Sequence, residues 1–483
     1  MRRIGRYPLL VACVALLAVG LGAATPSLAS AGSGPDACAT TARSLTGTLA
    51  DGATYKIEVP ANWNCTLFLY SHGYVAPGEA NPAQDVGDPI TGAWLLGHGY
   101  ALAGSSYTTT GWAIQQALPD QIATLNVFDQ QVGAPARTIA WGHSLGGIIT
   151  AGLIQDYPNR FTAALPMCGV LSGGIATWNT ALDSEVAFQQ LIDPSLQVVN
   201  IKDPAGNLEA ADQAVNAAQR TTQGQARIAL AAALGDTPGW FTPLSPEPAA
   251  NDYPAQEHNQ FLWDTEVDFP FVFALRAELE VRAGGNPSWT TGVNFAAQLA
   301  KSPNLAEVIA LYQAAGLSLR ADLATLNHAA RISADPGAVR YLAKYISFNG
   351  QLPVPVLTMH TTGDGLVIPE NEQAYASVVR QAGDSRMLRQ IFVSRAGHCA
   401  FTPAETITAA QTLLNRLATG QWNGQALQPS GLNAEASALG PGYNVFTNSQ
   451  GSLVATPPAF VNYRPYPYPR PFDLSSRAGS GAG

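Results

Sequence analysis

The sequence predicts an α/β fold in which a mostly parallel sheet carries helices on both faces. Three observations support this prediction. Apolar runs with strand character alternate with helical stretches on both sides of residue 144. Some of these runs, such as Cys65–Tyr70, are continuously apolar, as expected of strands buried on both faces. A Gly-His-Ser-Leu-Gly sequence at residues 142–146 joins a short apolar strand to a helix rich in small residues, which is typical of a sharp strand-to-helix turn.

The segment before residue 170 contains strands and helices in alternation. Tyr55–Val59 alternates apolar and polar residues, as a half-buried strand does. Proline at the first position of Pro119–Gln131 favours a helix start there. The predicted strands are Tyr55–Val59, Cys65–Tyr70, Tyr100–Tyr107, Arg137–Trp141 and Phe161–Met167, and the predicted helices are Ala93–Gly97, Pro119–Gln131 and the stretch after residue 144.

The pattern changes after Gly169, because no strand run is found between about Leu171 and Asn349. Short helical stretches separated by Pro-rich linkers, notably Thr237–Pro254, indicate a separate helical module, and its place in the chain makes it a candidate lid. Aromatic residues gather near its middle; we expect most to form its core and some to line a substrate pocket. The predicted helices are Ser184–Ile192, Leu208–Gln219, Gly224–Ala233, Phe271–Arg282, Thr291–Ala300, Leu305–Ala315 and Ser318–Ile332, and the aromatic residues are Trp240, Phe241, Phe261, Trp263, Phe269, Phe271 and Phe273.

Strand character returns after the helical module, and the chain then ends in a segment rich in Gly, Asn, Pro and Ser. Within that segment we expect Tyr463–Phe472 to wrap the domain in an extended form or to be partly disordered, and Gly479–Gly483 to be disordered. The returning elements are the strands Val354–His360 and Leu388–Val393 and the helices Asn371–Gln381 and Pro403–Ala418. The predicted organisation is a targeting segment (1–31), an α/β domain in two parts (32–169 and 351–419), a helical module between them (170–350) and a C-terminal extension (420–483).

The first residues have the pattern of a signal for export. Arg2, Arg3 and Arg6 form a positive region, Leu9–Leu21 is an uncharged and mostly apolar run, and the small residues at 29–31 fit a cleavage site near Ala31. The run is too short for an ordinary membrane span, and no later segment resembles one. The sequence therefore predicts a secreted protein.

The charge balance argues against a nucleic-acid partner. Without the three arginines of the targeting segment, the chain carries 22 basic and 34 acidic residues, a net charge of −12. This acidity lacks the basic footprint of a nucleic-acid-binding protein and fits a secreted globular protein.

Five cysteines are present, of which Cys13 leaves with the targeting segment. An even number in an exported protein predicts two disulfides, and the four remaining cysteines allow three pairings. We favour Cys38–Cys65 and Cys168–Cys399. The cysteines and histidines show no metal-ligand spacing, so neither a structural metal nor another cofactor is expected.

The turn at residues 142–146 is a nucleophile elbow, in which a serine hydroxyl projects above the sheet. Side chains two positions before and after Ser144 would collide with neighbouring backbone, which explains Gly142 and Gly146. The helix that follows directs its N-terminal N–H groups towards the developing anion. Leu145 therefore supplies one predicted oxyanion-hole N–H, and Tyr74, in the loop after the strand Cys65–Tyr70, supplies the other.

A serine nucleophile needs a base, and the base needs an orienting carboxylate; in this arrangement the chain order is Ser, acid, His. Asp364 follows the strand Val354–His360 in a Gly-Asp-Gly turn, and Glu370 is the alternative orienter. His398 follows the next strand, and His360 is the alternative base. His72 and His143 adjoin motif residues and are expected to shape those turns.

Four motifs point to a known family: SHGY (71–74), GHSLGG (142–147), TTGDGLV (361–367) and AGHCAFT (396–402). Through them the chain resembles the α/β-hydrolase superfamily over about Tyr55–Pro166 and Val354–Ala418. The resemblance implies that Gly169–Gly350 is the helical cap that many members insert at this place. The His398-Cys399 pair is similar to the tannase and feruloyl esterase group, in which a second cysteine precedes the nucleophile; here that position is His143.

The sequence thus predicts a secreted serine hydrolase that cleaves carboxylic esters, either small or polymeric, through Ser144, His398 and Asp364. The alternative is a peptidase or aminopeptidase of the same fold. A third hypothesis is an inactive binding module, although such modules usually lack the nucleophile or the histidine. Enzymes of this fold with an aspartate nucleophile are disfavoured by the serine at position 144.

Overall fold

The computed structural model describes residues 38, 41–448 and 450–470. The predicted targeting segment with its cleavage site near Ala31, and the chain end Gly479–Gly483, lie outside these residues. Within them, nine strands form one sheet in the order β1-β2-β4-β3-β5-β6-β7-β8-β11. Strands β3 to β8 are parallel to their neighbours, whereas β1, β2 and β11 are joined by antiparallel pairs. The predicted fold class, a mostly parallel sheet with helices on both faces, is confirmed.

The bounds of the strands agree closely with the predicted apolar runs. All six residues of β3 are buried, as the continuous apolar run predicted. The strand β1, which pairs with β2, was not predicted, because most of its residues are exposed and its sequence lacks an apolar run. The strands are β1 (Arg43–Thr48), β2 (Thr54–Val59), β3 (Thr66–Ser71), β4 (Ala101–Ser105), β5 (Arg137–His143), β6 (Ala163–Met167), β7 (Val356–Gly363), β8 (Leu388–Ala396) and β11 (Phe460–Val461), with β9 (Val445–Thr447) and β10 (Leu453–Ala455) in a separate pair.

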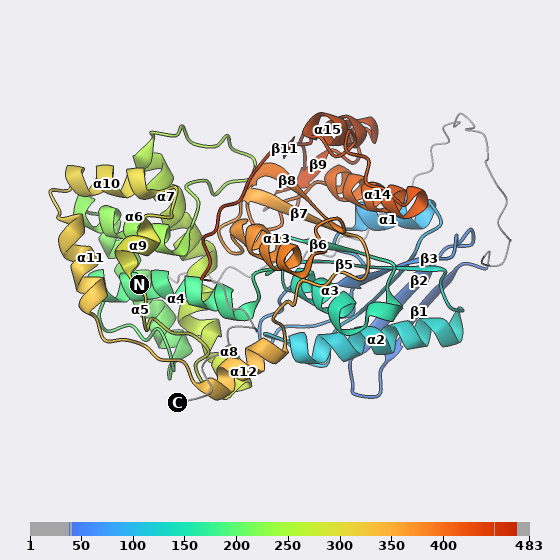
Figure 1. The fold of residues 1–483 in the computed structure, drawn as a ribbon, viewed down its shortest axis with the longest axis horizontal. Coiled ribbons are helices and arrows are strands. Elements are labelled where there is room, and N and C mark those ends of the chain that lie inside the picture. The colour runs from blue at the N-terminus through green and yellow to red at the C-terminus, as the bar shows by residue number, and fades with distance from the viewer. Residues whose placement is uncertain (1–37, 39–40, 449, 471–483) are drawn as a thin grey trace.

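Helices cover the two faces of the sheet (Figure 1). On one face, α2, α3 and α13 bury their apolar side chains in one core, and on the other α1, α14 and α15 form a second core. These helices are α1 (Pro89–Gly97), α2 (Ile114–Gln131), α3 (Leu145–Asp156), α13 (Glu370–Ala382), α14 (Pro403–Thr419) and α15 (Pro429–Ala438), with the short η1 (Pro158–Arg160) after α3.

A block of helices, which we call the inserted helices, lies between β6 and β7 at the left of Figure 1. All residues between β6 and β7 are described, and none of them forms a strand. The inserted helices have their own apolar core, separate from those of the sheet, with Phe188, Phe273 and Phe295 fully buried in it. They are α4 (Gly174–Leu191), α5 (Pro204–Ala218), α6 (Thr222–Gly235), α7 (Tyr253–Trp263), η2 (Asp264–Asp268), η3 (Pro270–Leu275), α8 (Arg276–Ala283), α9 (Phe295–Leu299), α10 (Leu305–Ala314), α11 (Leu319–His328) and α12 (Pro336–Lys344).

Prolines near helix starts account for two kinds of wrong prediction. The helix α2 begins at Ile114, so Pro119 lies inside it rather than at its first position. Conversely, α7 and α12 were not predicted, because Pro254 and Pro336 also suit linkers, although each stands in the first turn of its helix. A proline in the first turn removes an N–H that has no helical partner in any case, so it marks a start and not a break.

The C-terminal extension contains more regular structure than predicted. The helix α15 packs beside α14, and β11 adds to the sheet against β8, with Phe460 opposite Val393. The following segment, dark red in Figure 1, is extended and reaches the inserted helices. There the Tyr468 hydroxyl donates to the Ala233 carbonyl, and Arg470 donates to Asp183. This segment therefore ties the inserted helices to the sheet.

Replacement of Arg470 by alanine is expected to lower the free energy of unfolding by about 3–5 kcal/mol, because it leaves the fully buried Asp183 carboxylate without its cation. Arg470 makes two hydrogen bonds of 3.0 and 3.1 Å to that carboxylate and two more to backbone carbonyls. Urea unfolding measures the change. The control is Arg160→Ala, which breaks a half-exposed pair with Asp129 and should cost less than about 1 kcal/mol. Equal effects of the two variants would contradict the expectation.

Candidate active site

The turn between β5 and α3 holds Ser144 in a conformation that non-glycine residues rarely adopt, with φ 57° and ψ −122°. The Ser144 N–H donates to the Met167 carbonyl at 3.0 Å, and the Gly147 N–H donates to the Ser144 carbonyl at 2.8 Å. A Cβ atom at Gly142 or Gly146 would collide with the Ser71 carbonyl on β3. The two glycines are therefore required by the close approach of backbone that the sequence predicted.

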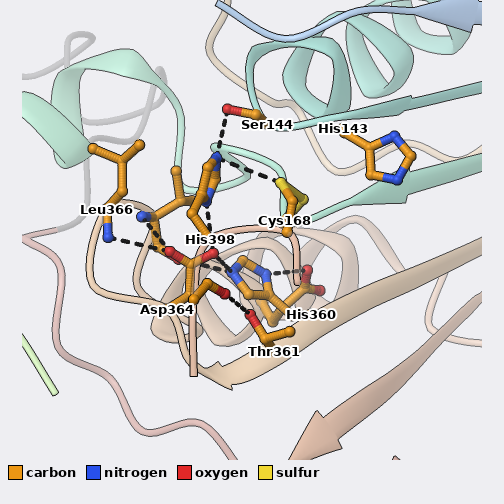
Figure 2. The surroundings of a disulfide bond; sticks show 12 residues. His143, Ser144, Cys168, His360, Thr361, Asp364, Leu366 and His398 are labelled. Atoms are coloured by element: carbon orange, nitrogen blue, oxygen red, sulfur yellow. Dashed lines mark hydrogen bonds and ion pairs between the residues drawn. A yellow bond between two sulfur atoms is a disulfide. The ribbon is translucent and has the colours of Figure 1, made fainter. Parts of the chain in front are cut away.

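Three residues far apart in the sequence meet above the carboxyl ends of β5, β7 and β8 (Figure 2). The Ser144 hydroxyl lies 2.7 Å from Nε2 of His398, and Nδ1 of His398 lies 2.8 Å from Oδ2 of Asp364. These distances allow the serine to donate to the imidazole and the imidazole to donate to the carboxylate. The structure thus brings together the three side chains that the sequence selected.

Asp364 is fully buried, and hydrogen bonds hold both of its carboxylate oxygens. Its Oδ1 accepts the backbone N–H groups of Leu366 and Val367 at 3.1 and 3.0 Å. Burial by itself would raise the pKa of this carboxyl, but attraction to His398 and His360 and the hydrogen bonds outweigh it and hold the pKa below its ordinary value. Asp364 is therefore ionised at neutral pH, as an orienting carboxylate must be.

His360 lies on the other side of Asp364 and does not contact Ser144 (Figure 2). Its Nε2 is 2.7 Å from the Val367 carbonyl and 3.5 Å from Oδ2 of Asp364, and its Nδ1 is 3.2 Å from Glu372. Burial lowers the pKa of this imidazole, yet Asp364 and Glu372 together raise it to about 10. His360 is thus a buried cation that faces the carboxylate. No pattern in the sequence indicates this arrangement, because nothing in the spacing of Glu372 pairs it with His360.

The remaining candidates for orienter and base lie away from these three residues. Glu370 is buried and accepts a hydrogen bond of 2.8 Å from the Tyr463 hydroxyl. His72 lies between the Gly73 and Ser106 carbonyls. His143 contacts the Tyr70 hydroxyl at 3.2 Å and points away from His398 (Figure 2), and burial lowers its pKa to about 4.

The loop after β3 passes next to the nucleophile. A Cβ atom at Gly73 would lie 3.4 Å from Cβ of Ser144, so this loop and the elbow are in contact. Tyr74 and Leu145 line the same cavity as Ser144. Their backbone N–H groups remain the predicted pair of oxyanion-hole donors.

The cavity at Ser144 is bounded by the sheet domain on one side and by the inserted helices on the other. From the sheet side it is lined by Ser144 and by Gly365–Ile368, and from the C-terminal segment by Pro469. Of the seven aromatic residues singled out in the sequence, Phe269, Phe271 and Phe273 line it, whereas the other four lie elsewhere. Ring contacts connect the two sides, because Phe271 meets Tyr74 edge to face with centroids 5.1 Å apart.

Both favoured disulfides, Cys38–Cys65 and Cys168–Cys399, are present. The second joins the end of β6 to the loop that carries His398, and Cys399 Sγ lies 3.4 Å from Nε2 of that histidine.

In the described part of the chain, no group of three or more His, Cys, Asp or Glu side chains is arranged to hold a metal ion. None of the described helices combines the length and apolarity that crossing a membrane requires.

Removal of the Cys168–Cys399 bridge by a double alanine variant is expected to lower both the stability, by about 2–5 kcal/mol, and kcat. The stability falls because the bridge closes a long loop, and kcat falls because the loop that carries His398 is released. The matched control is the double alanine variant of Cys38–Cys65, which should lose stability but keep its kcat. Steady-state kinetics with and without a mild reductant measure the effect. An unchanged kcat after loss of the Cys168–Cys399 bridge would show that packing alone holds His398 in place.

Comparisons with known proteins find hydrolases among the proteins that this chain is similar to. No family model matches the chain. It is 28% identical over 427 residues to the o-phthalyl amidase of Xanthobacter agilis, and the match covers 82% of this chain and 91% of that protein.

Among solved structures, a ligand-bound form of the rice cell wall degrading esterase LipA from Xanthomonas oryzae matches over 77% of this chain and 89% of its own, with 13% identity and a TM-score of 0.35. Feruloyl esterase B from Aspergillus oryzae matches over 78% of this chain and 80% of its own, with 12% identity and a TM-score of 0.37. The acylaminoacyl peptidase from Pyrococcus horikoshii matches over 74% of this chain and 37% of its own, with 10% identity and a TM-score of 0.33.

Proposed function

Because the chain has the α/β-hydrolase fold and is similar to hydrolases, we propose that it is a serine hydrolase that cleaves carboxylic esters through Ser144, His398 and Asp364. The observation that carries this proposal is the unbroken line of hydrogen bonds from the Ser144 hydroxyl through His398 to Asp364. In an inactive binding module there would be no need to keep these three side chains aligned at 2.7 and 2.8 Å in a cavity.

The proposed reaction begins when His398 takes the proton of the Ser144 hydroxyl as its oxygen bonds to the ester carbonyl carbon. The oxyanion that forms accepts the N–H groups of Leu145 and Tyr74. His398 then gives its proton to the leaving alcohol, and the acyl group stays on Ser144. His398 takes a proton from water as the water oxygen bonds to the acyl carbon; the bond from that carbon to the Ser144 oxygen then breaks, His398 returns the proton to that oxygen, and the acid leaves. Asp364 holds the imidazole in one tautomer and stabilises its cationic form in both steps.

A second function, hydrolysis of an amide bond, is favoured by the relative named o-phthalyl amidase. The same groups cleave amides, with the difference that His398 must protonate a more basic leaving amine. The inserted helices would act as the cap over either substrate, since they supply one wall of the cavity. Export of the protein is part of the proposal and is supported by the two disulfides.

Three experiments test the proposal. An organophosphonate is expected to label Ser144 in the folded protein, as measured by peptide mass spectrometry, and a folded protein without an adduct would favour the binding module. Rates on p-nitrophenyl acyl esters are then compared with rates on phthalyl amides and amino-acid p-nitroanilides. We expect the esters to be hydrolysed fastest, and a much faster amide or anilide reaction would reverse the ranking. N-terminal sequencing of the exported protein tests cleavage near Ala31.

A further inference from the structure

Two carboxyl groups of the inserted helices line the cavity that contains Ser144 and have no partner among the described residues. Asp264 and Asp268 stand at the two ends of η2, a π-helical turn. Asp264 is 5% exposed, and no described residue makes a hydrogen bond or ion pair with its side chain. One carboxyl oxygen of Asp268 is buried without a hydrogen bond. Buried polar groups are nearly always paired in folded proteins, so these two need an explanation.

No cation among the described residues of the cavity wall could serve these carboxyl groups, because the lining includes no Lys, Arg or His side chain. Arg276, a fully buried arginine of α8, is already bound by Glu280 at 3.1 Å and by Asn286 at 2.9 Å. It also lies 3.6 Å from Glu185, a third acid of the cavity wall, and over the ring of Trp178. The described wall therefore has an excess of acid that the protein itself does not balance.

In the protein without a ligand, ionisation of these unpaired acids costs free energy. Burial raises the pKa of Asp264 well above its ordinary value, with a further contribution from Glu257. Burial also raises the pKa of Asp268, and the carboxylates of Asp264 and Asp364 add to the effect. A ligand that brings a positive charge would remove this cost, because it would pair with the ionised carboxylates.

The rest of the wall suits a cation on an apolar framework. Seven aromatic rings line the cavity, and the faces of such rings attract organic cations. A carboxylate ligand, in contrast, would meet the acidic groups of the wall. The aromatic lining residues are Tyr74, Trp112, Trp178, Phe188, Phe269, Phe271 and Phe273.

We propose that the cavity selects substrates that carry a protonated amine, which Asp264 and Asp268 bind while Ser144 attacks the ester or amide carbonyl. The proposal rests on the proposed hydrolase function and names the substrate class of that same site. Binding the amine forms charge-assisted hydrogen bonds to the two carboxylates and places the apolar part of the substrate among the aromatic rings.

Competitive inhibition of p-nitrophenyl acetate hydrolysis tests the proposal with three probes of similar size: benzylammonium, benzyl alcohol and benzoate. We expect benzylammonium to bind about tenfold or more tightly than benzyl alcohol, and benzoate to bind most weakly. Asp264→Asn and Asp268→Asn should each weaken benzylammonium binding about tenfold and leave benzyl alcohol binding unchanged. The control is Glu266→Gln on the same turn, where the side chain is exposed and does not line the cavity.

Equal inhibition by the three probes, or tightest inhibition by benzoate, would overturn the proposal in the wild-type protein, whether or not the variants fold. Circular dichroism checks the fold of each variant. A folded Asp264→Asn or Asp268→Asn protein that keeps wild-type affinity for benzylammonium would also overturn it. Labelling of Ser144 by an organophosphonate distinguishes failure of the amine-binding proposal from failure of the hydrolase proposal. If Ser144 is labelled but the protein shows no preference for amines, only the amine-binding proposal is wrong. If the folded protein is not labelled, the hydrolase proposal is wrong.

Discussion

Ser144→Ala is expected to lower kcat by about 10⁴- to 10⁶-fold with little change in melting temperature. The serine hydroxyl is the atom proposed to form the acyl-enzyme, and its hydrogen bond is to His398, so its removal takes away the nucleophile and little else. The Cβ atom of alanine occupies the same turn, and the backbone bonds from Ser144 to Met167 and from Gly147 to Ser144 are kept. Ester hydrolysis under single-turnover conditions, together with thermal unfolding, measures both quantities.

The matched control for this variant is Ser377→Ala, in which the lost hydroxyl accepts a hydrogen bond from Arg380 on α13, away from the cavity. This variant should keep wild-type kcat. A Ser144→Ala protein that loses activity and folding to the same extent would show that Ser144 has a structural role, and a folded variant with near-wild-type activity would remove Ser144 as the nucleophile.

Asp364→Asn is expected to lower kcat by about 10⁴-fold, the size of the effect of the same change in the serine protease triad. The carboxylate accepts the Nδ1–H of His398, which leaves Nε2 free to take the proton of Ser144. An asparagine amide can donate to Nδ1 instead, and the proton then lies on Nε2, where it faces the serine. The imidazole can no longer act as the base. Steady-state kinetics on an activated ester measure the loss.

The control for this change is Asp129→Asn, which removes a carboxylate from a half-exposed pair with Arg160 and should leave kcat unchanged. A loss of less than about tenfold in Asp364→Asn would mean that another group orients the histidine. Glu370 is the second carboxylate that the sequence offers for this role, and its buried contact with Tyr463 predicts that Glu370→Gln has a much smaller effect on kcat than Asp364→Asn.

Local sequence signals predicted most of the sheet and the turn at the nucleophile. The run Cys65–Tyr70 is apolar because β3 is covered on both faces, and the glycines at 142 and 146 are present because backbone passes close to them. Elements without such a signal were not predicted. β1 is largely exposed, α7 and α12 begin with prolines that also suit linkers, and β11 exists because a two-residue stretch meets the edge of β8.

The sequence by itself determined the alternation of strands and helices and the elbow at Ser144. It also determined that an acidic residue and then a histidine follow the elbow along the chain. It favoured Asp364 over Glu370 and His398 over His360 by their order and place after the strands, but it could not show which of them meet Ser144, because each pair offers the same chemistry a few residues apart or on adjacent strands. Only the tertiary structure decided this, since a hydrogen bond depends on distances of about 3 Å that no spacing in the chain specifies. The same holds for Asp264 and Asp268, whose lack of partners among the described residues is a property of the folded cavity alone.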